Sequence, residues 1–206
     1  MPPTHLIISH PDQDSFNYTL HNAAFSLLSD HNQNDSLYQT DVYHLYCDHH
    51  PAVIPYGIPI APDSHEAIKL EQNKVRLSHL VIMQFPIYWF SLPALLKIYW
   101  ERILELGFAY PGKFEQSPLF GNKKILFSVT TKSTRQEYSK QGKNGTIKEN
   151  LFHLATTFRF VGFDILEPFV AYDVPDQTPA KLAQLIEDYQ GYLHTIIEKP
   201  KIWLTV

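Results

Sequence analysis

Three polar or aromatic stretches, each directly after an apolar run, carry the side chains best suited to chemistry. The first, HPDQDSFN at residues 10–17, precedes leucines and alanines at helical spacing. A helix amino terminus presents free amide protons and a partial positive charge, and both favour a phosphate group. His10, Ser15 and Asn17 add hydrogen-bond donors, so this stretch predicts an anion site. Capping of the helix by Ser15 and Asn17 is an equally good interpretation.

The second stretch, FPIYWFSLP, places three consecutive aromatic residues after a predicted strand. Tyr88, Trp89 and Phe90 would offer ring faces on which a flat ligand stacks, while amide protons of the loop could bond its edge. A packed aromatic corner or a dimer contact is the alternative.

The third stretch begins at Thr130 and Thr131 and runs to Gly145. Its other hydrogen-bonding or charged side chains include Lys132, Ser133, Arg135, Tyr138, Gln141 and Asn144. Donors and positive charge suit the negative charge of a reduced flavin or the phosphates of a nicotinamide cofactor. The basic residues that hint at the 2′-phosphate of NADPH are Arg135, Lys140, Lys143 and Lys148. A solvated, charged loop is the alternative.

A fourth group, His44, Cys47, His49 and His50, has nitrogen and sulfur ligands that suit zinc. Its spacing matches none of the common zinc patterns, and Pro51 favours an irregular loop. We therefore predict no metal site there. No segment resembles the GxSxG turn that exposes a catalytic serine.

Five predicted strands must position these stretches, at residues 4–9, 36–46, 79–86, 123–131 and 163–170. One predicted helix begins after Asp14 or Ser15. Four others cover residues 64–77, 94–106, 149–160 and 179–197. Alternating strands and helices need crossover connections, which place helices on both faces of a parallel sheet. The predicted fold is α/β, a flavodoxin-like doubly wound five-stranded parallel sheet of order 2-1-3-4-5. Ligands of such sheets bind outside the carboxyl ends of the strands, where the three stretches meet.

Composition narrows the class of protein. The chain has 206 residues, 44% of them hydrophobic, as expected for a single flavin-binding domain over residues 1–206. Its net charge of −4 argues against nucleic-acid binding, which needs clustered positive charge. Cys47 is the lone cysteine, and the sequence has neither a signal peptide nor an apolar run of ~18 residues. We expect a cytoplasmic protein without a membrane span.

Four segments together resemble the NAD(P)H:quinone oxidoreductase family, including its small bacterial NAD(P)H dehydrogenase (quinone) members. They are HPDQDSFNY, QFPIYWFSLPALLKIYWERILELGFAY, TTKSTRQEYSKQG and VGFDILEPFVAY, in the family's order and spacing. The second is the most specific. The resemblance covers most of the chain from Thr4 to Leu193.

The resemblance implies a homodimer that binds FAD, with FMN possible, and passes a hydride from NADH or NADPH through flavin N5 to a quinone or similar acceptor. The residues implied for the flavin phosphates and adenosine are His10, Ser15, Phe16 and Asn17. Those implied for the flavin ring are Pro86, Ile87, Tyr88, Trp89 and Phe90 on one side, and Thr130, Thr131, Lys132, Ser133 and Tyr138 at the opposite edge. The implied substrate pocket contains Trp89, Phe90, Phe160 and, from the partner subunit, Tyr110.

The sequence departs from the family at three places. Lys132 and Ser133 replace two glycines, and a side chain there would alter the flavin slot because glycine permits close backbone approach. Asn144 replaces a histidine implied to stabilise negative charge on the flavin, and an amide cannot become a cation. We hypothesise that Lys132 takes over this role, so the implied catalytic residues are Tyr138, Lys132 and Asn144. Gly112 replaces an aromatic residue, which predicts a more open substrate pocket.

Two other functions are compatible with the sequence. Some members of the family are ancillary subunits of potassium efflux systems, and the changes at Lys132, Ser133 and Asn144 would suit a flavin-binding regulatory subunit with weak turnover. A one-electron FMN carrier like the flavodoxins is the second alternative. Those carriers are typically shorter and more acidic, and the aromatic stretch fits a hydride-transferring dimer better.

Overall fold

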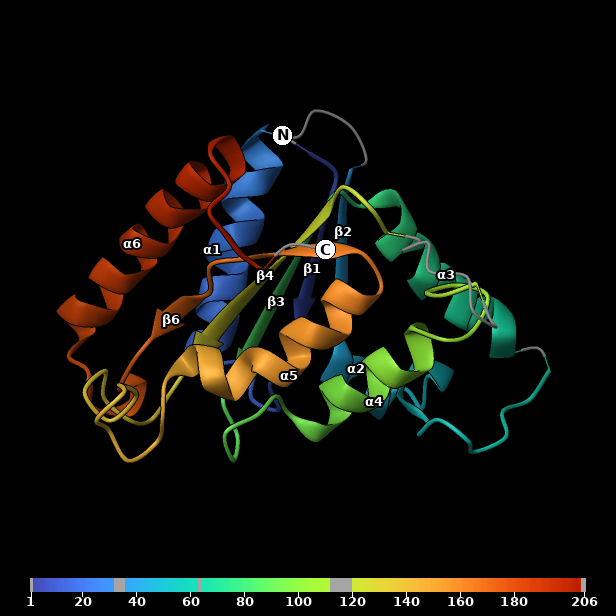
Figure 1. The fold of residues 1–206 in the computed structure, drawn as a ribbon, viewed down its shortest axis with the longest axis horizontal. Helices are drawn as coiled ribbons and strands as arrows, with labels where there is room; N and C mark the ends of the chain where they lie inside the picture. The colour runs from blue at the N-terminus through green and yellow to red at the C-terminus, as the bar shows by residue number, and fades with distance from the viewer. Residues whose placement is uncertain (1, 32–35, 63, 112–119, 205–206) are drawn as a thin grey trace.

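The computed structural model describes residues 2–31, 36–62, 64–111 and 120–204 (Figure 1). Its central strands are β1 (Thr4–Ile8), β2 (Leu37–Asp41), β3 (Leu80–Pro86), β4 (Lys123–Thr130) and β5 (Phe163–Leu166). They pair in parallel in the order β2-β1-β3-β4-β5. The predicted flavodoxin-like α/β sheet is therefore confirmed.

Helices cover both faces of this sheet (Figure 1). The helices are α1 (Phe16–His31), α2 (Val42–Cys47), α3 (Ser64–Leu77), α4 (Ala94–Ile103), α5 (Ile147–Phe160) and α6 (Pro179–Glu198), with short 3-10 turns η1 (Pro51–Val53) and η2 (Val174–Asp176). Helices α1 and α6 share one hydrophobic core with the sheet, and α3, α4 and α5 share the other. Figure 1 shows α1 and α6 on the left of the sheet and α3 and α4 on the right.

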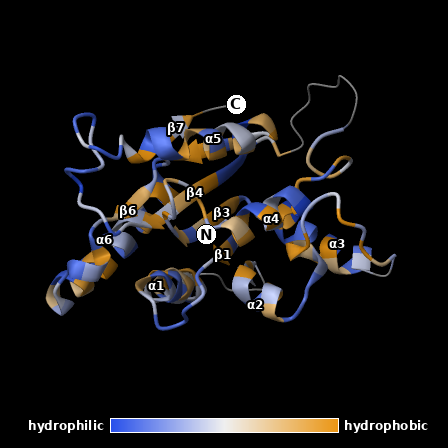
Figure 2. Ribbon diagram, turned by 90° about the horizontal axis from the view of Figure 1, so that it is seen from below, coloured by the Kyte–Doolittle hydropathy of each residue, from blue (hydrophilic) through white to orange (hydrophobic). Residues whose placement is uncertain are grey.

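The central strands are buried on both sides. Every residue of β1 and β3 is buried, as expected for parallel strands with helices on both faces. In Figure 2 the hydrophobic residues are concentrated in β3 and β4. The sheet is therefore a rigid platform whose carboxyl ends point to the lower edge of Figure 1.

The strand predicted at residues 36–46 is confirmed only as far as Asp41, where β2 ends. The rest of that prediction is wrong, because α2 follows. Asp41 lies in extended backbone and its carboxylate accepts a hydrogen bond from the His44 N–H at 3.0 Å. This contact caps the short helix by satisfying an amide that has no partner within it. The alternation of apolar residues in VYHLY does not separate a strand from a single helical turn.

The predicted last strand, residues 163–170, is interrupted. Its first half is β5 and its second half lies in β6 (Phe169–Ala171), and both halves pair with β4. Ile125 of β4 pairs with Ile165, and Ser128 of β4 pairs with Phe169. The segment from β5 to β6 therefore has one residue more than the stretch of β4 beside it. The extra residue forms a bulge, where the Glu167 N–H donates to the Lys201 carbonyl at 2.9 Å.

The sheet also has an antiparallel edge strand that was not predicted, β7 (Ile202–Leu204), which pairs with β5. Helix α5 begins at Ile147, two residues before its predicted start. Thr146 and Glu149 form a reciprocal capping box there, and this arrangement satisfies two amides of the first turn. Neither change affects the edge of the sheet that carries the three stretches.

Candidate functional site

A cavity of about 810 Å³ lies at the carboxyl edge of the sheet, between the loops that follow β1, β3 and β4. The predicted site residues that line it are His10, Ser15, Phe16, Asn17, Pro86, Ile87, Tyr88, Trp89, Thr130, Thr131 and Lys132. Three lining residues were not predicted: Asp12, Val174 and Pro175. The structure thus brings the three stretches together around one space, as expected for this fold.

Ser15 and Asn17 do not cap α1 in the way that the sequence allowed. The Ser15 hydroxyl oxygen is buried and has no hydrogen-bond partner among the described residues. Asn17 instead directs its side chain toward the sheet, where its Nδ2 donates to Thr130 Oγ1 at 2.9 Å and its Oδ1 accepts from Gln84 Nε2 at 2.9 Å. The Ser15 hydroxyl therefore has no use within the described part of the fold, and Asn17 is a buried structural link.

The loop after β3 folds into a tight turn, Tyr88–Ser91, which we call the aromatic turn. The Tyr88 N–H donates to the Ser91 carbonyl at 2.9 Å, and the Ser91 N–H donates to the Tyr88 carbonyl at 3.0 Å. Trp89 is 93% exposed and Phe90 48% exposed, so the turn is not a packed aromatic corner. Trp89 lines the cavity, whereas Phe90 is outside its lining.

The start of the third stretch is hydrogen-bonded to β6 and to the residues that follow it. The Thr131 N–H donates to the Ala171 carbonyl at 2.9 Å, and the Val174 N–H donates to the Thr131 carbonyl at 3.0 Å. These bonds explain why Val174 and Pro175 reach the cavity. Their position after the last parallel strand was the available sequence signal, but the sequence alone did not show that β6 ends beside β4. Lys132 stays exposed at the cavity.

Most of the basic residues that could have met the 2′-phosphate of NADPH have partners within the chain. Lys143 pairs with Glu137 at 2.7 Å, Lys148 pairs with Glu167 at 2.8 Å, and the Arg135 guanidinium lies 4.8 Å from the centre of the Tyr172 ring. The hydrogen bond from Lys143, together with hydrogen bonds from the backbone and side chain of Thr134, lowers the pKa of Glu137 to about 2. The two ion pairs offset the charge of Lys143 and Lys148, and the ring contact occupies Arg135, so these residues do not support the suggested preference for NADPH.

Three further predicted residues lie outside the cavity lining. Tyr138 is buried and its ring centre is 6.3 Å from that of Tyr172, and burial raises the pKa of the Tyr138 hydroxyl. Ser133 accepts hydrogen bonds through its carbonyl from the Thr131 hydroxyl and from the Asp173 N–H. Asn144 is held through its backbone, because its N–H donates to the Glu137 carbonyl at 3.1 Å. The chain as folded therefore does not bring the side chains of Tyr138 and Asn144 to the cavity.

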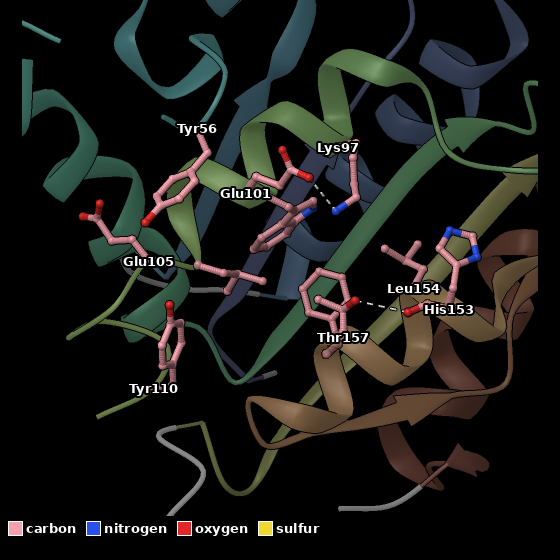
Figure 3. Close-up of a pocket in the computed structure, with 11 residues that line it drawn as sticks. Tyr56, Lys97, Glu101, Glu105, Tyr110, His153, Leu154 and Thr157 are labelled. Carbon is pink, nitrogen blue, oxygen red and sulfur yellow. Dashed lines mark hydrogen bonds and ion pairs between the residues drawn. The ribbon is translucent and has the colours of Figure 1, made fainter. Parts of the chain in front are cut away.

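Tyr110 and Phe160, predicted for the substrate pocket, meet each other away from this cavity. Their ring centres are 6.4 Å apart, and Phe160 is 71% exposed. Tyr110 lines a second cavity of about 380 Å³ between α4 and α5 (Figure 3). In Figure 3, Tyr56, Glu105 and Tyr110 lie on one side of this cavity and Lys97 and His153 on the other. The prediction for Gly112 lies outside the described residues.

Neither a metal site nor a membrane helix is found in the part of the chain that the structure describes. No group of three His, Cys, Asp or Glu side chains there is arranged to hold a metal ion. No described helix is long and apolar enough to cross a bilayer.

A parallel sheet of order 2-1-3-4-5 with a cavity at its carboxyl edge is the arrangement of a flavodoxin-like protein. A family model described as flavodoxin-like fold matches residues 3–193. NAD(P)H dehydrogenase (quinone) 1 of Rattus norvegicus is 30% identical, over 96% of this chain and 78% of its own length. Ribosyldihydronicotinamide dehydrogenase (quinone) of Homo sapiens is 36% identical, over 96% of this chain and 93% of its own. The chain therefore belongs to the flavodoxin-like family and, within it, to the NAD(P)H dehydrogenase (quinone) oxidoreductases.

A solved structure with the same fold is general stress protein 14 of Treponema denticola, which was crystallised in complex with FMN. It is 22% identical, with a TM-score of 0.71, and the match covers 95% of this chain and 99% of that one. At this identity the likeness establishes the fold alone.

Proposed function

We propose that this protein is a flavin-dependent oxidoreductase that takes a hydride from NADH or NADPH and reduces a quinone or a similar acceptor. The observation that carries the proposal is one cavity lined both by the exposed aromatic turn and by a serine hydroxyl without a partner. These features fit the two parts of a flavin nucleotide, a flat ring and a phosphate. The rat and human relatives are both named for a reduced nicotinamide compound as the electron donor and a quinone as the acceptor. We extend both kinds of substrate to this chain.

The residues before α1 fit the phosphate. Ser15 precedes a helix of 16 residues, so first-turn amide protons and the helix dipole act beside its unpartnered hydroxyl. His10 lines the same space. Asp12 also lines it, but one of its carboxylate oxygens is engaged by the Asp14 N–H at 2.9 Å. We therefore assign His10, Ser15 and Phe16 to the phosphate end, with Asn17 as the buried support beneath it.

The aromatic turn and its flanks fit the ring. Within the described residues, the N–H groups of Trp89 and Phe90 make no hydrogen bond. Amides of this kind can donate to the carbonyl and ring-nitrogen edge of a flavin while Trp89 lies against a ring face. Pro86, Ile87 and Tyr88 complete that wall. Thr130 and Thr131 continue the lining beside it, since the Ile87 N–H donates to the Thr130 carbonyl at 2.9 Å.

A bound flavin would supply two-electron chemistry, accepting hydride at N5 and returning it to the acceptor. The protein's own part is to orient the ring, exclude water and compensate charge. Lys132 is an exposed cation at the cavity, and it makes no ion pair within the described residues. We assign to it the stabilisation of negative charge at the ring edge. We keep Ser133 and Tyr138 as candidate flavin contacts, and Tyr138 and Asn144 as candidate catalytic residues. Each lies outside the cavity lining, so the loop would have to move to bring it to a ligand.

The proposal includes FAD as the cofactor, with FMN as the alternative, and a homodimer. Support for a dimer comes from large apolar side chains that are exposed at the cavity, at the end of α5 and after α4. Trp89 and Phe160 are 93% and 71% exposed, and Leu106 is 59% exposed. A second copy would cover these side chains and bring its Tyr110 and Phe160 to the substrate side of the ring, together with Trp89 and Phe90.

The test is anaerobic mixing of flavin-loaded protein with NADH or NADPH, followed by addition of a simple quinone. Bleaching of the flavin's visible absorbance and its recovery with quinone are the expected results. Bound flavin that neither donor bleaches would contradict the proposal and favour a regulatory flavoprotein. Mass analysis of the released cofactor distinguishes FAD from FMN, and light scattering measures the oligomeric state.

A further inference from the structure

The aromatic turn has a backbone conformation that its residues do not favour. Trp89 has φ of 48° and Phe90 has φ of 64°, so both lie in the left-handed region. A two-residue turn with positive φ at both positions is usually built from Asn-Gly or a similar pair, because a β-carbon crowds the following carbonyl. A turn made of tryptophan and phenylalanine therefore needs support from the surrounding structure.

A histidine on another element contacts the last residue of this turn. Ser91 Oγ and His153 Nε2 lie 3.2 Å apart and form a hydrogen bond. No other side-chain hydrogen bond from the four residues of the aromatic turn is found among the described residues. His153 belongs to α5, and Figure 3 shows its ring at the margin of the second cavity.

The helix that carries His153 is firmly anchored. On α5, Leu151, Leu154 and Phe158 are buried in the core, and the capping box fixes the amino end of the helix. His153 itself is exposed, at the margin of the second cavity. A rigid helix thus holds one end of an exposed turn through a single side chain.

We propose that His153 is a positioning residue, whose hydrogen bond to Ser91 holds the aromatic turn in its ligand-ready conformation. The purpose of that conformation, presentation of Trp89 and two amides to a flavin ring, rests on the proposed function. The order of the turn itself does not, and it can be measured without flavin.

The first experiment is amide hydrogen exchange on flavin-free protein, comparing the wild type with His153→Leu and Ser91→Ala. Each variant should speed exchange at the Tyr88 and Ser91 amides by roughly five- to tenfold, the size expected when one hydrogen bond is lost. The double variant should add nothing further, since both changes remove the same bond. His153→Gln, which retains a donor, should restore much of the protection.

His79→Leu is the matched control, because it removes another exposed histidine that makes no contact with the turn. It should leave exchange at Tyr88 and Ser91 unchanged. The positioning role is overturned if His153→Leu behaves like this control, or if it speeds exchange throughout α5 as strongly as in the turn.

A titration of the flavin-free proteins with FMN and with FAD gives the second readout. His153→Leu should weaken the binding of at least one flavin by about fivefold, which is the loss expected if the turn must first be ordered. If His153→Leu alters exchange but the wild type binds no flavin, the proposed function is overturned. The dependence of the turn's order on His153 would still stand. Unaltered exchange with normal flavin binding would overturn the positioning role alone.

Discussion

The side-chain amide of Asn17 donates a hydrogen bond to the Thr130 hydroxyl at 2.9 Å, although the two residues are 113 positions apart in the sequence. The Asn17 carbonyl oxygen also accepts from Gln84 Nε2 at 2.9 Å. One buried side chain at the start of α1 therefore joins the carboxyl-terminal parts of β3 and β4. This link lies where the loops that line the cavity leave the sheet.

Replacement of Asn17 by alanine should lower the free energy of unfolding by about 1–3 kcal/mol, because it leaves buried polar groups of Gln84 and Thr130 without partners. Urea denaturation measures the change. Asn22→Ala is the control, since Asn22 is exposed on the same helix. Equal stability of the two variants would show that the link does not hold the edge of the sheet together.

Ser15→Ala should weaken flavin binding without destabilising the protein. The Ser15 hydroxyl has no partner among the described residues, so its removal costs the fold nothing. A hydrogen bond to a charged phosphate contributes about 1.5–3 kcal/mol, so we expect roughly 10- to 100-fold weaker binding. Fluorescence titration measures the affinity, with Ser26→Ala, an exposed serine of α1, as the control. Unchanged affinity would remove Ser15 from the phosphate site.

Lys132→Met should slow reduction of the bound flavin by NADPH by at least about tenfold, or ~1.4 kcal/mol in the barrier, because it removes the exposed cation at the cavity. Stopped-flow absorbance measures this rate. Lys140→Met, an exposed lysine in the same loop, is the control. A change within about twofold would mean that Lys132 does not stabilise charge on the flavin.

His5 should make the protein less stable as the pH falls. The side chain is fully buried, and this burial, aided by the nearby charge of Lys74, lowers the pKa of the imidazole from 6.5 to about 3. Below pH 6.5 the unfolded chain therefore binds a proton that the folded chain excludes, and the free energy of unfolding decreases until the pH approaches 3.

Between about pH 7 and about pH 5.5 this effect amounts to roughly 1 kcal/mol. The variant His5→Gln lacks it and can keep a hydrogen bond to Thr40. Urea denaturation at both pH values should show the wild type losing about 1 kcal/mol more than the variant. His21 and His50, whose pKa values burial also lowers, are present in both proteins and cancel in the comparison. Equal losses would mean that His5 is charged in the folded state.

Gly142→Ala should disrupt the third stretch, because a β-carbon at this position would lie 2.2 Å from the Glu137 carbonyl oxygen. We expect a loss of about 1–3 kcal/mol, measured by thermal unfolding. Gly191→Ala is the opposite case: nothing lies within 4 Å of an added β-carbon in α6. That variant should gain about 0.5–1 kcal/mol, since alanine loses less backbone entropy in a helix. A neutral Gly142→Ala variant would show that the loop can rearrange.

Much of the architecture was predictable because it depends on local patterns. Continuous apolar runs identified β1, β3 and β4, helical spacing identified α1, and the predicted helix at residues 64–77 is α3 as observed. Strand–helix alternation then fixed which edge of the sheet carries the loops. The gathering of His10, Trp89 and Thr131 around one cavity follows from this geometry.

Other features depended on contacts between distant segments. The bulge at Glu167, the strand β7 and the approach of Val174 to Thr131 all require pairing with residues that local periodicity does not reveal. The partners of Lys143 and Arg135 likewise decided whether those charges were free, and composition alone left them open.

The sequence by itself determined the α/β class and the edge of the sheet at which the three stretches gather, because hydrophobic periodicity is local and strand–helix alternation fixes where the loops leave a parallel sheet. Only the tertiary structure decided that Ser15 is free while Asn17 is engaged, and that a turn of tryptophan and phenylalanine is supported by His153. The physical reason is that a polar side chain takes whichever partner the folded chain brings within hydrogen-bonding distance, and that partner can be more than a hundred residues away, as Thr130 is from Asn17.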